Sequence, residues 1–178
     1  MKYLIQTIGI IAATFSIIAF QAKKHKNIML FKGIDSVVFA VQWGLLHDWT
    51  SMALTIISIV RNFLFGYLGG KKVNLIPFII GFSIANIVAG IFTYSDWSSI
   101  LKTLATVITT ISFGLRKESF VRLLTIPACL LGVIHACLPW HLSVGGIITE
   151  SFTIASIIVA MIRFRKVKPK DLPNTNIN

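Results

Sequence analysis

Runs of apolar residues follow one another along the whole chain and are separated by short polar breaks. Each run is close to the roughly 20 residues that an α-helix needs to cross the hydrocarbon core of a membrane. Most runs lack the polar stripe that a helix on the surface of a soluble protein carries. The pattern therefore predicts an all-α integral membrane protein with seven transmembrane helices, at about residues 3–20, 27–46, 49–68, 73–94, 97–115, 119–140 and 141–164.

The composition favours the same class. The 178 residues are 55% hydrophobic and only 13% charged, whereas about a quarter of the residues in a soluble domain are charged. The net charge of +11 would indicate nucleic-acid binding on a soluble surface, but here the basic residues lie in the polar breaks and the C-terminal tail. We therefore expect the lipid bilayer as partner and no nucleic acid. The segment 1–20 has no small-residue cleavage site, so it should remain as the first span.

Basic residues concentrate on alternate breaks, which indicates the orientation. Cytoplasmic breaks of membrane proteins carry an excess of lysine and arginine. This rule places the N-terminus outside and the C-terminus in the cytoplasm of a bacterial inner membrane. Trp49, Tyr94, Trp97 and Trp140 then mark the outer interface. The basic breaks and tail contain Lys23, Lys24, Lys26, Lys71, Lys72, Arg116, Lys117, Arg165, Lys166, Lys168 and Lys170, while the other side holds Lys2, His47, Asp48, Asp96 and His141.

An internal repeat is visible in the third and seventh predicted helices. Thr55-Ile-Ile-Ser58 recurs as Thr153-Ile-Ala-Ser156, and each helix then carries an arginine, Arg61 and Arg163. Two units with an odd number of helices are parallel only when a single helix separates them. The sequence therefore predicts two parallel three-helix repeats, a linker helix and a cytoplasmic basic tail, at residues 1–68, 97–164, 73–94 and 165–178 respectively.

Three short motifs connect the chain to a known family. They are the basic break Lys23–Lys26, the helix end Ile57–Asn62, and the spaced residues Glu150, Ser156 and Ile162–Phe164. On these motifs the chain resembles, over nearly its whole length, the YgjV family of bacterial inner-membrane proteins. Its layout also resembles the SWEET and PQ-loop architecture, whose halves are related by an axis along the membrane normal. The resemblance implies a fold and a location but no particular substrate. SWEET-like proteins carry a hinge proline in the first helix of each repeat, and this chain has none there.

Arg61 and Asn62 are adjacent polar residues inside the third predicted helix. A charge at the bilayer centre costs from about 3 to above 10 kcal/mol by different estimates. Arg61 lies only about 7.5 Å from the helix end at Gly66, a distance that a snorkelling side chain can reach. Neighbouring residues on a helix point about 100° apart. At least one of the two side chains should therefore face the bundle, and both explanations of Arg61 stay open.

Glu150 and Asp35 are acidic residues deep inside predicted helices. Glu150 lies too deep for a short side chain to reach the surface, so it is protonated, paired or in contact with water. Either a proton-linked or solute-binding role fits, or a structural ion pair or hydrogen bond within the bundle, for instance to Lys102. Asp35 has Lys32 three residues earlier as a local ion-pair partner. Arg61, at a similar depth on the next helix, is the preferred cross-helix partner.

The remaining deep polar residues are neutral. Gln42, Asn86 and His135 are of the types that more often form interhelical hydrogen bonds than bind ligands. His135 belongs to the residue type that titrates near neutral pH. Cys129 and Cys137 lie about 12 Å apart along one predicted helix, too far for a disulfide.

The sequence contains no phosphate-binding loop, metal-spaced His/Cys set or nucleophile motif. We therefore expect no enzyme, cofactor or metal. The favoured function is a small inner-membrane transporter-like protein that moves a small polar solute, a sugar or related compound, between the two repeats. A structural or regulatory membrane protein without transport is the alternative, and homo-oligomerisation stays open. The expected pathway residues are Asp35, Arg61, Asn62, Asn86, His135 and Glu150.

Overall fold

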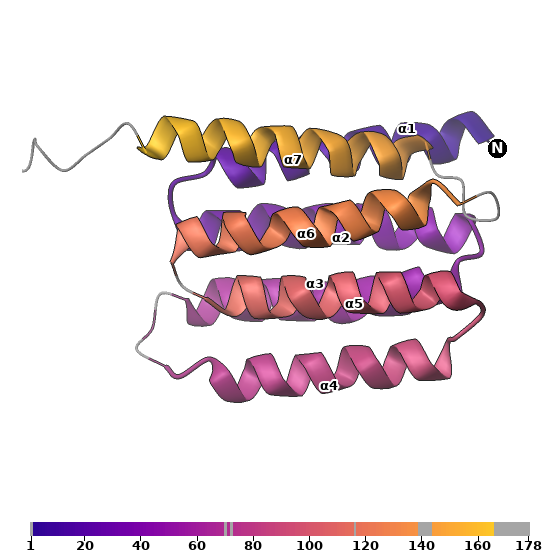
Figure 1. Ribbon diagram of the computed structural model, residues 1–178, viewed down its shortest axis with the longest axis horizontal. Helices are drawn as coiled ribbons and strands as arrows, with labels where there is room; N and C mark the ends of the chain where they lie inside the picture. Colours follow the sequence, from indigo (N-terminus) through magenta and orange to yellow (C-terminus); the bar gives the residue numbers. More distant parts are fainter. Residues whose placement is uncertain (1, 70, 72, 116, 139–143, 166–178) are drawn as a thin grey trace, which may run out of the picture.

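The computed structural model describes residues 2–69, 71, 73–115, 117–138 and 144–165, with the side chains of 2–6, 145, 164 and 165 left out. Every regular element in these ranges is an α-helix, so the predicted all-α fold is confirmed there. Figure 1 shows the helices running alongside one another, with α1 beginning and α7 ending at opposite ends of the bundle. The helices are α1 (Lys2–Gln21), α2 (His25–Leu45), α3 (Trp49–Leu68), α4 (Ile76–Phe92), α5 (Trp97–Gly114), α6 (Glu118–Ala136) and α7 (Val144–Arg165).

The observed bounds differ from the predicted spans by a few residues. α2 begins at His25 instead of Asn27, and α6 ends at Ala136, four residues before the predicted end at 140. Cys137 therefore follows α6 instead of lying within it, and both cysteines are free thiols. The tail was predicted to begin at Arg165, but Arg165 is the last residue of α7. Residues 166–178 of the predicted tail, together with Lys72, Arg116, Trp140 and His141, lie outside the described residues.

Four helical segments in the described ranges are long and apolar enough to cross a membrane. They are His25–Leu45, Trp49–Leu68, Glu118–Ala136 and Gly146–Arg163. Thr7–Gln21 of α1 and Ile76–Phe92 are apolar but shorter. α5 is more polar, because it carries Lys102 and a series of serines and threonines.

Short-range signals explain where two of the helices begin. Asp48 precedes α3 and accepts a hydrogen bond of 2.9 Å from the backbone N–H of Ser51. Asp96 precedes α5 and accepts one of 2.7 Å from Ser98 N–H. A carboxylate at this position satisfies an N–H that would otherwise lack a partner. The turn before α3 also holds His47 at a φ of 56°, which lets the chain reverse within a few residues.

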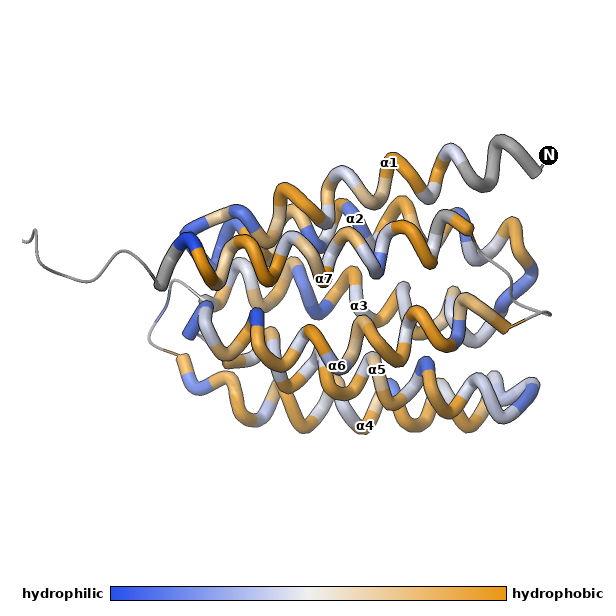
Figure 2. Tube along the Cα trace, turned by 45° about the horizontal axis from the view of Figure 1, so that its top comes forward, coloured by the Kyte–Doolittle hydropathy of each residue, from blue (hydrophilic) through white to orange (hydrophobic). Residues whose placement is uncertain are grey.

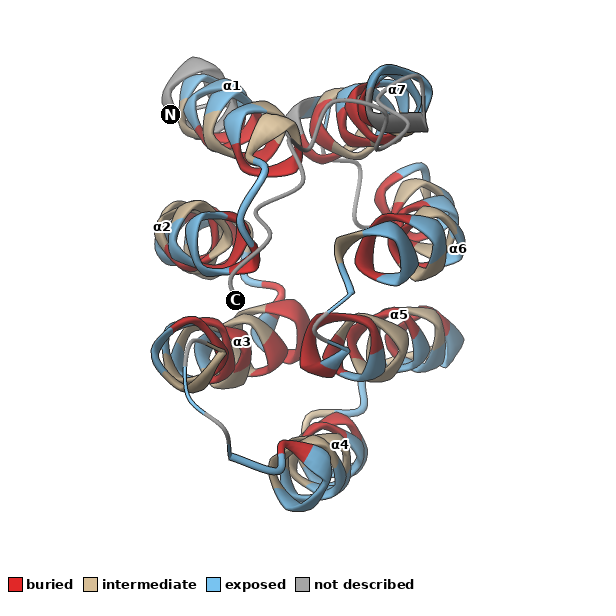
Figure 3. Cartoon of the chain, turned by 90° about the vertical axis from the view of Figure 1, so that its left-hand side faces the viewer, coloured by how far each residue is buried: buried red, intermediate tan, exposed pale blue. Residues whose placement is uncertain are grey.

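The helices form two rows that face each other (Figure 3). One row is α1, α2 and α3, and the opposite row is α7, α6 and α5. α1 packs on α7 at one end of the rows, and α3 packs on α5 at the other end. α4 lies outside the rows and contacts both α3 and α5.

Many polar side chains are buried inside the bundle, while many large apolar ones are exposed on its outside. Phe92 is 85% exposed, while Arg61 is 2% exposed and Asn86 is fully buried. Figure 2 shows hydrophobic residues along most of each helix and hydrophilic ones mainly at the turns and at a few internal positions. A soluble protein has the reverse distribution. The surface therefore matches lipid, which offers no hydrogen bonds to a polar group.

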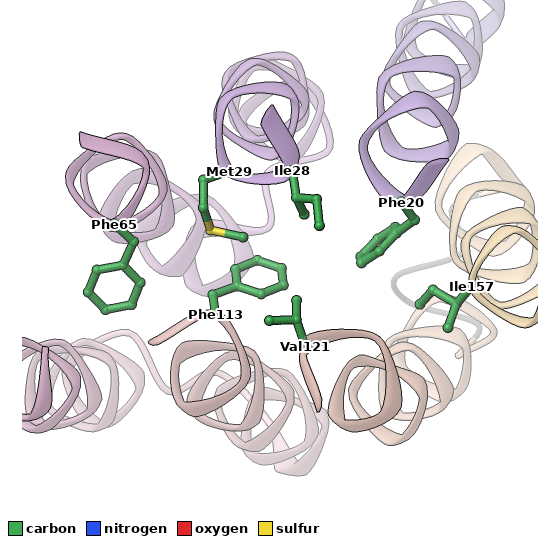
Figure 4. Packing of buried hydrophobic residues seen from close by; sticks show 7 residues of the cluster. All are labelled: Phe20, Ile28, Met29, Phe65, Phe113, Val121 and Ile157. Carbon is green, nitrogen blue, oxygen red and sulfur yellow. The ribbon is translucent and has the colours of Figure 1, made fainter. Parts of the chain in front are cut away.

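A compact apolar cluster, here called the apolar plug, fills part of the interior (Figure 4). Most of its members lie within a few residues of the helix ends that adjoin the basic breaks. It joins side chains from six helices, so it fixes both rows relative to each other. Its members are Phe20, Ile28, Met29, Phe65, Phe113, Val121 and Ile157, all at most 1% exposed.

Removing a ring from the apolar plug should loosen the bundle. The Phe65 ring packs edge-on against Phe82 of α4 at 5.8 Å between ring centres. Lipid is as apolar as the interior, so Phe65→Ala should cost mainly the cavity part of a Phe→Ala change, about 2 to 3 kcal/mol. Thermal unfolding in detergent measures this. Phe92→Ala, at an 85% exposed position, is the matched control and should leave the midpoint nearly unchanged; equal effects would contradict the assigned packing.

Candidate functional site

A cavity of about 110 Å³ lies between the two rows, which is room for several water molecules. Its wall is formed by α2, α3, α5, α6 and α7. Phe113 belongs both to this wall and to the apolar plug, so the plug borders the cavity. The polar wall residues are Lys32, Asp35, Ser36, Thr55, Ser58, Lys102, Thr106, Thr109, Thr125 and Glu150.

Lys32 and Asp35 form an ion pair on the α2 side of the cavity. Ser16 of α1 supports this pair, accepting from the Lys32 ammonium at 2.9 Å and lying 3.4 Å from Asp35 Oδ2. The other carboxylate oxygen, Asp35 Oδ1, is buried and has no hydrogen-bond partner among the described residues. The predicted local pair is confirmed, and it leaves one acceptor unused beside the cavity.

Glu150 reaches the cavity from α7 and lies against α6. A Cβ atom added at Gly132 would come within 2.9 Å of Glu150 Oε1, so only a glycine leaves room for this carboxylate. Glu150 and Lys102 both line the cavity, yet in the described structure they form no ion pair with each other. The ion pair with Lys102, the example considered for a structural role of Glu150, is therefore not formed.

Lys102 enters the cavity from α5, and its side chain lies against the aromatic ring of Trp43. Its ammonium lies 4.8 Å from the centre of the Trp43 ring, a distance at which the ring face attracts a cation. Phe39 stacks on Trp43 with the ring centres 6.3 Å apart. Trp43 therefore holds the lysine by its face and leaves the hydrogen-bond donors of the ammonium available.

Arg61 does not snorkel, so that explanation is wrong. Its guanidinium is buried between α3 and α5 and donates to Thr110 Oγ1 at 2.7 Å. It also donates to Asn62 Oδ1 at 3.1 and 3.0 Å. The Phe113 ring lies 5.2 Å away and adds a cation–π contact. The helix rotation that packing imposes turns Arg61 inward, where α5 supplies hydroxyl acceptors.

Asn62 and Asn86 complete the same network. Asn62 donates to the carbonyl of Lys32 and to Ser36 Oγ, both at 3.1 Å, which ties α3 to α2. Asn86 of α4 donates to Thr110 Oγ1 at 3.1 Å. The predicted cross-helix pair between Asp35 and Arg61 is wrong, because Asp35 pairs with Lys32 on its own helix. Arg61 donates instead to the side-chain oxygen of Asn62, its neighbour on α3.

His135 lies away from the cavity, near the bundle end opposite the basic breaks. Its Nε2 is 3.1 Å from Asp48 Oδ2 and 3.2 Å from Ser51 Oγ, and its Nδ1 is 3.3 Å from the Ser98 carbonyl. Burial disfavours the charged form of Asp48, but the hydrogen bonds from His135 and Ser51 outweigh it and keep the pKa of Asp48 below its usual value. This cluster, here called the histidine clamp, joins the turn before α3 to α5 and α6.

The six predicted pathway residues therefore separate into three places. Asp35 and Glu150 line the cavity; Arg61, Asn62 and Asn86 form one network; His135 belongs to the histidine clamp. The sequence analysis considered the cavity lysines, Lys32 and Lys102, only as ion-pair partners of acidic residues. Both lie inside apolar runs, and this position is the signal that could have identified them as cavity residues. No local signal marks Trp43 as cavity wall, because an aromatic residue in an apolar run is unremarkable.

The buried polar groups, the apolar surface and the all-helical bundle define a polytopic helical membrane protein. Residues 3–168 match the family model described as bacterial inner membrane protein, Imp-YgjV. The chain belongs to this YgjV family, as its motifs indicated. No curated protein and no solved structure matches the chain.

Removing Asn62 should destabilise the bundle. Asn62→Ala takes an acceptor from Arg61 and a donor from Ser36, which leaves a buried cation with fewer partners. A lost bond to a charged group costs about 1.5 to 3 kcal/mol. Thermal unfolding in detergent measures the change, and Asn27→Ala, at an exposed position of α2, is the control. If both variants melt together, the network contributes nothing to stability.

Proposed function

We propose that this inner-membrane protein moves a small polar solute across the membrane through the central cavity. The observation that supports this most directly is the lining: Lys32, Asp35, Lys102 and Glu150 surround one space within an apolar bundle. Charges inside a membrane are costly and usually mark a solute or ion pathway. The proposal assigns no enzymatic activity, catalytic residue, cofactor or metal.

The arrangement of the helices is consistent with two parallel repeats that all cross the membrane. A half-turn about the bundle axis would exchange α1 with α5, α2 with α6 and α3 with α7, given the rows in Figure 3. α4, outside the rows, has the place that a linker helix needs. Transporters with such repeats bind solute near the membrane midplane at the repeat interface. The cavity lies between the two rows, as this relation requires.

The apolar plug borders the cavity, and the histidine clamp lies beyond Trp43, whose ring contacts His135. The two differ in chemistry, which suits opening at one side at a time. The apolar plug lies toward the basic end, and the histidine clamp lies toward the opposite end. The plug is held by packing alone, whereas the clamp is held by hydrogen bonds. Two barriers of different kinds can respond to different events during a transport cycle.

The competing function is a structural or regulatory membrane protein. The Arg61 network favours it, because Arg61 bonds to Asn62 and Thr110, and Asn86 bonds to Thr110. None of these three residues, Arg61, Asn62 and Asn86, lines the cavity. Such a protein would show no flux, and its polar variants would only lose stability. The cavity charges weigh against it, since Lys102 and Glu150 line one space without pairing to each other there.

Counterflow in proteoliposomes tests transport. Reconstituted protein should exchange at least one member of a panel of radiolabelled sugars, organic acids, amines and amino acids. Glu150→Gln should slow this exchange roughly tenfold or more, equivalent to about 1.4 kcal/mol, because the cavity loses a charge. Glu118→Gln, at the start of α6 and outside the cavity, is the matched control. No exchange of any solute by well-folded protein would refute transport and leave the structural function.

We further propose that the N-terminus faces outward and the C-terminus faces the cytoplasm. Lys23, Lys24, Lys71 and Lys117 lie in described turns, and Lys26 lies in the first turn of α2, at the same end of the bundle, which fits the positive-inside rule. A fluorescent protein fused to the C-terminus should be bright in cells, while a periplasm-dependent phosphatase fused there should be inactive. A phosphatase fused after Asp48 should be active. The reverse pattern would contradict this orientation.

A further inference from the structure

The cavity combines two positive and two negative side chains. Lys32 and Asp35 come from α2, Lys102 from α5 and Glu150 from α7. In their ordinary charge states the four groups cancel. Coulomb energies are large at low dielectric constant, so a solute with a net charge would leave an uncompensated charge in the bundle. The site therefore suits a solute that is neutral overall.

An uncharged solute would nevertheless leave several groups unsatisfied. Within the described structure, the Lys102 ammonium has no ion-pair partner. Its one cation–π contact there is with the face of Trp43. Glu150 forms no ion pair there, and Asp35 Oδ1 has no hydrogen-bond partner. A buried charge that loses water without gaining a partner is expensive. These groups require a solute that carries both an anionic and a cationic end.

We propose that the solute is a small zwitterion, with its ammonium group bound by Glu150 and Asp35 Oδ1 and its anionic group bound by Lys102. This inference rests on the proposed transport function and adds the chemical class of the solute. Lys102 and Glu150 enter from different helices of the same row, and Asp35 enters from the opposite row. A zwitterion that binds all three residues would connect the two rows.

The cavity volume restricts the zwitterion to a small one. About 110 Å³ accommodates a few non-hydrogen atoms, comparable to an α-amino acid with a small side chain. The stacked rings of Phe39 and Trp43 form one wall of the cavity. A long or branched side chain would have to displace this wall or the Phe113 ring.

Binding to the purified full-length protein in detergent tests the charge requirement. The probes are L-alanine, which carries both charges, with ethylamine and propionate as its two charged halves and glycerol as a neutral solute. Isothermal titration calorimetry should show alanine binding at least about tenfold more tightly than either half, since one charged hydrogen bond is lost in each case. Equal or tighter binding of glycerol would overturn the proposal.

Variants that remove one cavity charge should each weaken the binding of one end of alanine. Lys102→Gln should weaken alanine to the level of ethylamine, because the anionic end loses its partner. Glu150→Gln should weaken alanine toward the level of propionate, because the ammonium group keeps only Asp35 Oδ1 as a partner. Lys117→Gln and Glu118→Gln are the matched controls outside the cavity and should bind as the wild type does. If the two cavity variants bind alanine unchanged, the assigned contacts are wrong.

A glycine variant keeps every charge and covers the case in which charge removal prevents folding. Gly132→Ala should displace the Glu150 carboxylate, because the new Cβ would meet Glu150 Oε1 at 2.9 Å. The displaced atoms are the end of a flexible side chain, so the fold should persist while alanine affinity falls about tenfold or more. Gly81→Ala, where nothing lies within 4 Å, is the control. Unchanged affinity in folded Gly132→Ala would contradict the site.

The outcomes separate this inference from the proposed function. Alanine binding without counterflow would refute transport and retain the zwitterion site. Counterflow of a sugar with no binding of alanine, glycine or other small zwitterions would retain transport and refute the zwitterion. Single-charge solutes binding as tightly as alanine would also refute it.

Discussion

The constraint behind the whole structure is that a polar group turned inward must find its partner within the protein, because lipid supplies none. Arg61 shows it most clearly. Its charge is compensated by the side-chain oxygen Oδ1 of Asn62, the hydroxyl of Thr110 and the face of Phe113, which come from two helices. Asn62 and Asn86 then extend these bonds to α2 and α4. One buried cation thus joins four helices, in a bundle whose outer surface contributes no hydrophobic driving force for association.

Some buried polar atoms lack a hydrogen-bond partner in the described structure, among them Ser83 Oγ and Asn86 Oδ1 away from the cavity. The cavity adds charged groups that are incompletely paired. Lys32 and Asp35 neutralise each other, but Asp35 Oδ1 has no partner in the described structure, and Glu150 and Lys102 do not pair across the space. Gly132 permits the position of Glu150, since any side chain there would collide with its carboxylate. A protein built only for stability gains nothing from this arrangement. A protein that receives a polar solute gains a partner for each group when the solute enters.

The apolar plug, which borders the cavity, and the histidine clamp, which lies apart from it, are held by different interactions. The apolar plug packs rings and aliphatic chains from six helices against one another. The histidine clamp uses Asp48, Ser51 and the Ser98 carbonyl around His135, and its strength depends on a few hydrogen bonds. α4 packs on α3 and α5 outside the rows and supports the Arg61 network through Asn86, so it braces the bundle without lining the cavity.

The sequence by itself determined the helical elements, the membrane class and the family, because apolar periodicity and basic breaks are local properties of the chain. Its motifs also drew attention to Asp35, Arg61 and Glu150 as costly residues. Only the tertiary structure decided their partners. Arg61 was open to snorkelling or to pairing with Asp35, and the rotation of α3 against α5 gave it Thr110 instead. That rotation depends on packing between helices far apart in the chain. The meeting of Lys102, Trp43 and Glu150 at one cavity, and the separation of His135 from it, follow from the same long-range packing.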